Sequence, residues 1–133
     1  MNRKNARENA FILLFEGLIK SDETAEEIFA KACERGLEYD DYVKNVFFGS
    51  IENRMIINET LERSLKGWKQ SRVSYVSRAI MTLSAYELMF LEDIPARVSI
   101  NEAIELAKKY DDEKAYTLVN GVMNAVAEEL KRK

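Results

Sequence analysis

The side chains that perform catalysis in most enzymes are scarce in this sequence. It has no histidine, and its single cysteine, Cys33, cannot form an internal disulfide and is expected in the core. Acidic side chains lie close together in three places: Glu26 with Glu27, Glu102 with Glu105, and residues 111–113. No aromatic pocket or third group is evident that would separate the pKa values of these carboxylates, as acid–base catalysis requires. No glycine-rich phosphate loop or paired-cysteine motif is present. We therefore expect a binding protein rather than an enzyme, without a metal or a cofactor.

Charge is unevenly distributed along the chain. The net charge at neutral pH is −3, which alone argues against nucleic-acid binding, but the placement of charges matters more than their sum. Residues 1–20 carry four basic and two acidic groups, residues 21–42 two and eight, residues 43–80 seven and three, and residues 81–133 seven and ten. An acidic segment therefore follows a basic N-terminus, and a second basic segment lies in the middle of the chain.

Three cations, Arg3, Lys4 and Arg7, fall near the start of an amphipathic helix expected over residues 3–19. Cations at a helix N-terminus oppose the helix dipole, so their placement is consistent with an anionic ligand. Phe15 follows this basic start on the same predicted helix, and Tyr116 follows the loop before the last helix. Partial exposure would let either ring stack on a ligand or a partner, and burial in the core is the alternative for both.

Apolar residues spaced three and four apart predict helices throughout and no convincing strand. Besides the helix at residues 3–19, helices are expected from Thr24 to Gly36, from Asp40 or Asp41 to Gly67, from Val73 to about Asp93, from Ser99 to Tyr110, and from about Asp112 to the C-terminal residues. A glutamate three residues after Thr24 and after Ser99 predicts a capping box at each. The apolar runs are too short to cross a membrane and no signal peptide is evident. We expect one cytoplasmic domain formed by residues 1–133.

An Asn-Gly pair, Asn120 and Gly121, interrupts the last predicted helix. Asn-Gly between apolar runs is a strong hairpin signal, but helical spacing continues on both sides, from Ala115 to Leu130. We therefore place both residues inside the helix, where a glycine costs about 1 kcal/mol relative to alanine. Close approach of another helix would offset that cost, and Asn120 would then bond a partly buried polar group such as a helix end. Trp68 is expected to be a core anchor.

The second half of the chain carries a series of ordered motifs. They are Trp68 and Arg72, then residues 86–88 (Tyr-Glu-Leu), 94–95 (Ile-Pro), 100–103 (Ile-Asn-Glu-Ala) and 119–122 (Val-Asn-Gly-Val). In this order and at these spacings they resemble the NusB family of bacterial transcription antitermination factors. The basic start of the chain is similar to the first helix of that family, whereas residues 20–64 match it only in helical character.

The resemblance implies an all-α protein of about six or seven helices packed as two small bundles, without enzymatic activity. It also implies binding of boxA-type single-stranded RNA in ribosomal RNA leader transcripts, together with NusE, a small-subunit ribosomal protein. Together they would act in an antitermination complex with RNA polymerase. The RNA-binding residues that the resemblance implies are Arg3, Lys4, Arg7, Lys114, Tyr116 and Leu118. The contacts with NusE that it implies are Phe15 and Ser77.

Three positions depart from the family pattern. Many members have a carboxylate where Ser77 stands, an arginine where Thr82 stands and a phenylalanine where Leu118 stands. The missing carboxylate would weaken contact with NusE, and the missing aromatic ring would weaken base stacking, which contributes roughly 1–3 kcal/mol per base. Lys114, at a position that is acidic in some members, would instead add attraction for phosphate.

Other interpretations of the sequence remain open. A helical scaffold or homodimer that binds only protein would make the N-terminal cations dispensable. Related helical domains also precede the catalytic domain of ribosomal RNA cytosine methyltransferases, so the chain could correspond to such a fragment. A helical enzyme that depends on Glu102 is a more distant alternative. The sequence does not distinguish a monomer from a dimer.

Overall fold

The computed structural model describes all residues from Met1 to Lys133 and contains seven α-helices, one short 3₁₀ turn and no strand. The helices are α1 (Arg3–Ile19), α2 (Ala25–Glu34), α3 (Asp41–Glu52), α4 (Arg54–Ser64), α5 (Tyr75–Phe90), α6 (Ala96–Tyr110) and α7 (Ala115–Glu129), and the 3₁₀ turn is Gln70–Arg72. The predicted all-α fold is confirmed. None of the helices combines the length and the apolar character needed to cross a membrane.

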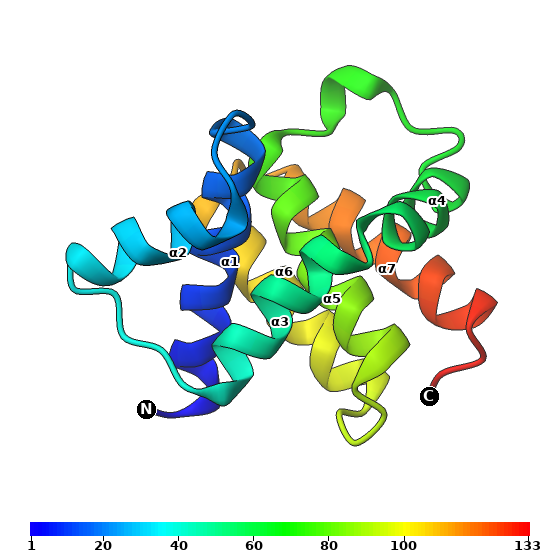
Figure 1. Cartoon of the computed structure of the whole chain (residues 1–133). Coiled ribbons are helices and arrows are strands. Elements are labelled where there is room, and N and C mark those ends of the chain that lie inside the picture. The colour runs from blue at the N-terminus through cyan, green and yellow to red at the C-terminus, as the bar shows by residue number, and fades with distance from the viewer.

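Helix α5 lies at the centre of the molecule. It contacts α1, α3, α4, α6 and α7, so it joins the N-terminal helices to the C-terminal ones (Figure 1). Its central position follows from its composition, because small and apolar residues cover most of its circumference and are buried from Ala79 to Leu88 with only Thr82 partly exposed. One hydrophobic core draws side chains from all seven α-helices.

Local sequence signals fix several helix ends as predicted. The Thr24 hydroxyl accepts a hydrogen bond from the Glu27 amide while the Glu27 carboxylate accepts one from the Thr24 amide, which is the predicted capping box. Gly36, just beyond α2, has a φ of +97°, the left-handed conformation that glycine adopts without strain. Cys33, on the last turn of α2, is half-buried rather than a core residue.

The prediction of one long helix after Asp40 is wrong, because this segment forms two helices, α3 and α4, that are separated at Asn53. The Asn53 backbone amide makes the ordinary helical bond to the carbonyl oxygen of Gly49 at 3.0 Å, and its side-chain amide donates to the same oxygen at 2.8 Å, a local side-chain bond of the kind that bends helices. The break also changes which residues face inward. Met55 continues the four-residue apolar spacing of Val43, Phe47 and Ile51 but is 75% exposed, whereas Ile57 is fully buried.

The capping box predicted at Ser99 is also wrong. Helix α6 begins at Ala96, directly after Pro95, and proline is well suited to a helix start because its φ is already helical and it lacks an amide proton. Ser99 therefore lies in the helix, where its buried hydroxyl is 2.8 Å from the hydroxyl of Ser84 on α5. Glu102 is free to approach α1 instead of capping α6.

The Asn-Gly pair lies inside α7, as the apolar spacing predicted. The group that approaches Gly121 is not another helix but the indole of Trp68, from the loop between α4 and α5. A Cβ atom added to Gly121 would lie 3.0 Å from Cζ2 of Trp68, so an alanine there would push the ring away. Asn120 does not bond a helix end; it is exposed, and its side-chain oxygen accepts from Asn124 one turn later.

Candidate nucleic-acid interface

The first turn of α1 presents two exposed cations, Arg3 and Lys4, and neither forms an ion pair. The guanidinium of Arg3 lies 4.3 Å from the ring centroid of Tyr42. The Asn2 side chain accepts a hydrogen bond from the Asn5 amide and so caps the helix without adding a negative charge. Because the helix dipole is also positive at this end, the start of α1 is a strongly positive feature of the surface.

Arg7 differs from these two cations because its side chain is only 5% exposed. Its Nε donates to Oε2 of Glu87 at 2.9 Å, and its Nη1 lies 3.6 Å from Oε1 of Glu102. Tyr42 donates to the same Glu87 oxygen at 2.5 Å. Burial disfavours the charged guanidinium, but the Glu87 carboxylate raises the pKa of Arg7 above its usual value. Arg7 therefore joins α1 to α5 and α6 and is not available to RNA in this conformation, which corrects its expected role.

Burial and the Glu87 carboxylate also raise the pKa of Tyr42 well above its usual value, so the phenol remains a donor. The sequence did contain a signal for the cluster of Arg7, Tyr42 and Glu87. Glu87 falls on the apolar stripe of α5, where an unpartnered carboxylate would be strongly unfavourable, so a buried cation had to lie opposite it.

Three of the residues expected to bind RNA come from the start of α7. The Asp112 carboxylate accepts from the amides of Lys114 and Ala115, at 2.9 and 3.0 Å, and so caps this helix. Lys114 is exposed without an ion pair, and Tyr116 is 43% exposed. Leu118, in contrast, is fully buried. It belongs to the core and offers no surface for a base, which corrects its expected role.

An open hollow of about 600 Å³ lies at the junction of α6 and α7, and it is lined by Lys108, Lys114 and Tyr116 together with Asp111, Glu113 and Thr117. The ammonium of Lys108 is 5.5 Å from the ring centroid of Tyr116, within the range of a cation–π contact. The neighbouring Lys109 pairs with Glu8 of α1 at 2.8 Å, and this hydrogen bond lowers the pKa of Glu8. The C-terminal end of α6 thus connects the two basic regions, at the starts of α1 and α7.

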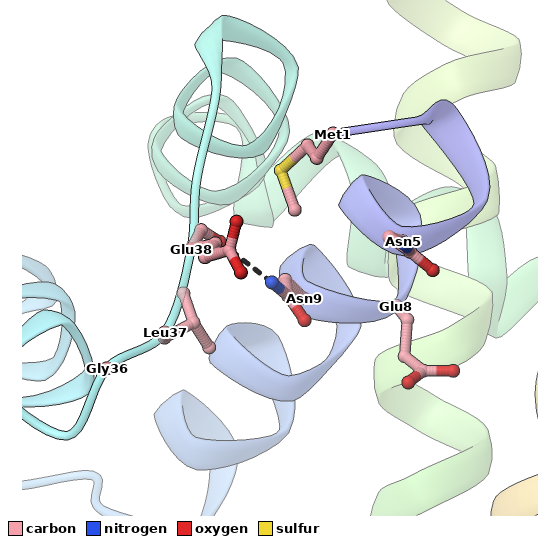
Figure 2. Close-up of a pocket in the computed structure, with 7 residues that line it drawn as sticks. All are labelled: Met1, Asn5, Glu8, Asn9, Gly36, Leu37 and Glu38. Carbon is pink, nitrogen blue, oxygen red and sulfur yellow. Dashed lines mark hydrogen bonds between the residues drawn. The ribbon is translucent and has the colours of Figure 1, made fainter.

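A second hollow, of about 300 Å³, lies on the side of α1 that faces the link between α2 and α3 (Figure 2). Asn9 donates to the backbone carbonyl oxygen of Glu38 at 2.7 Å and ties this link to α1, as Figure 2 shows. The hollow is lined by the carboxylates of Glu8 and Glu38 and by no lysine or arginine. Its charge does not suit an RNA backbone.

The two expected protein contacts differ in exposure. Phe15 is half-buried on α1, with its ring centroid 6.2 Å from that of Phe11, which in turn lies 5.0 Å from Tyr110. Ser77 is fully buried, and its hydroxyl donates to Oδ2 of Asp111 at 2.7 Å. Ser77 therefore cannot contact a partner directly in this conformation.

The carboxylate beside Ser77 belongs to Asp111, which the sequence did not indicate as a neighbour of Ser77. Ser74 also donates to its Oδ2, at 2.5 Å. Burial opposes the charge of Asp111, but the hydrogen bonds from Ser74 and Ser77 lower its pKa below the usual value. Ser77 itself carries no charge, but a carboxylate is thus held beside it. Thr82, the third departure, is half-exposed and lines a separate hollow of about 150 Å³ with Leu14 and Leu18.

The fold and the site together define an all-helical domain whose candidate site is basic and aromatic. The model of the NusB family matches residues 4–128. The transcription antitermination protein NusB of Bacillus licheniformis is 43% identical to the chain over 130 residues, which cover 98% of this chain and 99% of that protein. The chain belongs to the NusB family.

Solved structures agree with this assignment. A structure of T. maritima NusB is 35% identical and superposes with a TM-score of 0.84 over 97% of this chain and 92% of that one. A chain from a crystal structure of the antitermination factors NusB and NusE in complex with dsRNA is 30% identical, with a TM-score of 0.83 over 96% of each chain.

Proposed function

We propose that this chain is an antitermination factor that binds boxA-type RNA of ribosomal RNA leader transcripts together with NusE and supports read-through by RNA polymerase. The proposal rests on which cations lack an ion-pair partner. Arg3 and Lys4 on α1 and Lys114 just before α7 have no carboxylate partner, and Tyr116 offers an exposed ring beside Lys114. Unpaired cations next to an accessible aromatic ring suit single-stranded RNA, which binds by backbone attraction and base stacking.

The proposal places NusE beside Phe15 and Asp111. Phe15 packs against the buried Phe11, which contacts Tyr110, the residue before Asp111, and the Asp111 carboxylate accepts hydrogen bonds from Ser74 and Ser77. Phe15 would contribute apolar contact, and Asp111 would supply the negative charge that Ser77 itself lacks. Support comes from the relative of similar fold that was crystallised with NusE and dsRNA.

The test is a titration of fluorescently labelled boxA-type RNA, followed by anisotropy, with and without NusE and at two salt concentrations. We expect binding that tightens with NusE. It should weaken in Arg3→Gln, in Lys4→Gln and in Tyr116→Ala, each tested separately. Arg97→Gln is the matched control, because Arg97 is also an exposed cation without an ion pair but lies at the opposite end of α6 from Lys108, about 16 Å away along the helix.

Each alternative result has a definite meaning. Absence of RNA binding under both conditions would refute the proposal and favour a scaffold that binds only protein. Equal effects of the Arg3 and Arg97 changes would show that general charge, rather than the start of α1, determines affinity. A scrambled RNA of the same length and composition tests sequence preference, and a duplex of the same sequence tests the expected preference for single strands.

A further inference from the structure

The loop between α4 and α5 carries the second basic segment of the chain, which the proposed RNA surface does not yet include. No carboxylate occurs between Glu62 and Glu87. Two cations of this stretch are neutralised, because Arg63 pairs with Glu129 and Arg78 pairs with Glu62. The three cations of the loop itself, Lys66, Lys69 and Arg72, are exposed and form no ion pair. The loop therefore concentrates positive charge that the protein does not compensate.

The conformation of this loop is held by particular contacts. Gly67, which follows the end of α4, has a φ of +92°, so the chain turns there in a conformation that favours glycine. The Trp68 amide donates to the carbonyl oxygen of Leu65 at 3.0 Å, and its indole packs against the Cα face of Gly121 on α7. Gly121 in the middle of a helix thus has a structural role, since a Cβ atom there would lie 3.0 Å from the ring and force it to shift.

The same contacts place the loop next to the proposed RNA surface. Nη2 of Arg72 lies 3.5 Å from the backbone carbonyl oxygen of Lys114, at the start of α7. The Arg72 guanidinium is also 5.8 Å from the ring centroid of Trp68, which connects the basic side chain to the anchored ring. In Figure 1 the loop stands out from the helices between α4 and α5. Lys66, Trp68 and Gln70 help to line an open hollow of about 240 Å³ on it.

We propose that the loop of residues 66–72 is a second binding element for the sugar–phosphate backbone of the RNA, positioned by the packing of Trp68 on Gly121. This inference rests on the proposed function and extends its surface from Lys114 to Arg72, Lys69 and Lys66. A polyanion fits this loop because Lys66, Lys69 and Arg72 follow one another along it and no carboxylate pairs with them. The half-buried indole lies among them, an arrangement typical of single-strand binding surfaces.

The first experiment compares two triple variants that remove equal charge. The loop variant is Lys66→Gln, Lys69→Gln, Arg72→Gln. The control variant is Arg97→Gln, Lys131→Gln, Lys133→Gln, which changes three exposed cations without ion pairs near the start of α6 and the end of α7. The end of α7 is about 20 Å along the helix from the start beside the loop. Both variants change surface side chains only, and circular dichroism will verify that each is folded.

For a single strand, each phosphate contact adds about 0.7 to the slope of log affinity against log salt concentration. One contact therefore contributes about fivefold in affinity at 0.1 M salt relative to 1 M salt. Three contacts therefore predict that the loop variant loses about 100-fold in affinity for the boxA-type RNA at 0.1 M salt. Its salt slope should fall by about 2. The control variant should stay within about threefold of the unmodified protein, with an unchanged slope.

The second experiment uses Trp68 as a local probe, since it is the only tryptophan in the chain. We expect RNA to change the Trp68 emission of the unmodified protein and of the control variant at the concentration where anisotropy rises. Trp68→Ala keeps every cation but loses the anchor, so we expect about tenfold weaker RNA binding. Trp68→Phe, which keeps a ring against Gly121, should retain part of the RNA affinity that Trp68→Ala loses.

The outcomes separate this inference from the proposed function. If RNA binding depends on Arg3, Lys4 and Tyr116 while the loop variant matches the control variant, the loop inference is overturned and the proposed function stands. A loop variant that loses affinity for NusE but not for RNA also overturns it, because the loop would then be a protein contact. If the unmodified protein binds no RNA with or without NusE, both fail.

Discussion

Replacing Arg7 by alanine separates a structural role from an RNA-binding one. The change would leave the fully buried Glu87 carboxylate without its cation, and Oε1 of Glu87 already has no hydrogen-bond partner. Removing one member of a buried ion pair costs about 3–5 kcal/mol. A domain of ordinary stability unfolds with about 5–15 kcal/mol, so Arg7→Ala should lose a large part of the free energy of unfolding. The Arg7→Ala protein should therefore unfold at much lower urea concentrations than the unmodified protein.

A compensated variant provides the matched control. Replacing both charges, as Arg7→Met with Glu87→Leu, removes the unpaired carboxylate, and such replacements are often neutral or stabilising by about 1–4 kcal/mol. The Tyr42 hydroxyl would then lose its acceptor, at a cost of about 1–3 kcal/mol, so the variant also includes Tyr42→Phe. We expect this triple variant to recover most of the stability that Arg7→Ala loses.

The assay is urea unfolding followed both by Trp68 fluorescence and by far-ultraviolet circular dichroism, because coincident transitions test two-state behaviour. RNA affinity is measured on the same proteins. The triple variant lacks the Arg7 guanidinium, so unchanged RNA affinity would show that Arg7 acts through the fold. A loss of less than 1 kcal/mol in Arg7→Ala, combined with RNA affinity reduced as much as in Arg3→Gln, would refute the buried-pair reasoning.

Three further expectations concern other parts of the molecule. Thr24→Ala removes the hydroxyl that caps α2 and should lower the free energy of unfolding by about 1 kcal/mol, measured in urea. Phe15→Ala should weaken NusE binding about tenfold in a calorimetric titration with little effect on RNA binding alone; the reverse pattern would contradict its assignment. Because the hydrogen bonds to Asp111 lower its pKa below the usual 3.8, its stabilising contribution is present above about pH 4 and is lost as the pH falls below that value. The difference in stability between the unmodified protein and Asp111→Asn should therefore shrink from pH 6 to pH 3, and a constant difference would contradict the role of the hydrogen bonds.

Local signals predicted the fold well where a single residue decides the outcome. The bounds of α1, the capping box at Thr24 and the left-handed Gly36 all follow from nearby residues. The break at Asn53 could not be predicted in the same way, because apolar spacing continues through it. At the break the Asn53 side chain bonds the carbonyl oxygen of Gly49, a contact that the spacing does not encode.

The site was predictable by region but not residue by residue. Sequence places cations at the starts of α1 and α7, but burial depends on partners that are distant in the chain: Arg7 and Glu87 are 80 residues apart. Leu118 was expected on the surface by analogy with an aromatic position, although its own place on the apolar stripe of α7 predicted the core. Asp111 was missed because nothing local to it indicates that Ser74 and Ser77 donate to its carboxylate.

The pairing of charges explains how a chain of net charge −3 can present a surface for RNA. The unpaired cations on the proposed surface are Arg3, Lys4, Lys66, Lys69, Arg72 and Lys114. If all six contacted phosphates of a single strand, the salt slope of log affinity would be about −4 and affinity would fall about 300-fold between 50 and 200 mM salt. Such steep dependence leaves little affinity at high salt from this chain alone. A partner such as NusE that extends the contact surface should therefore matter most at high salt, so the tightening produced by NusE should grow with salt concentration if its own contacts are less salt-sensitive than these six.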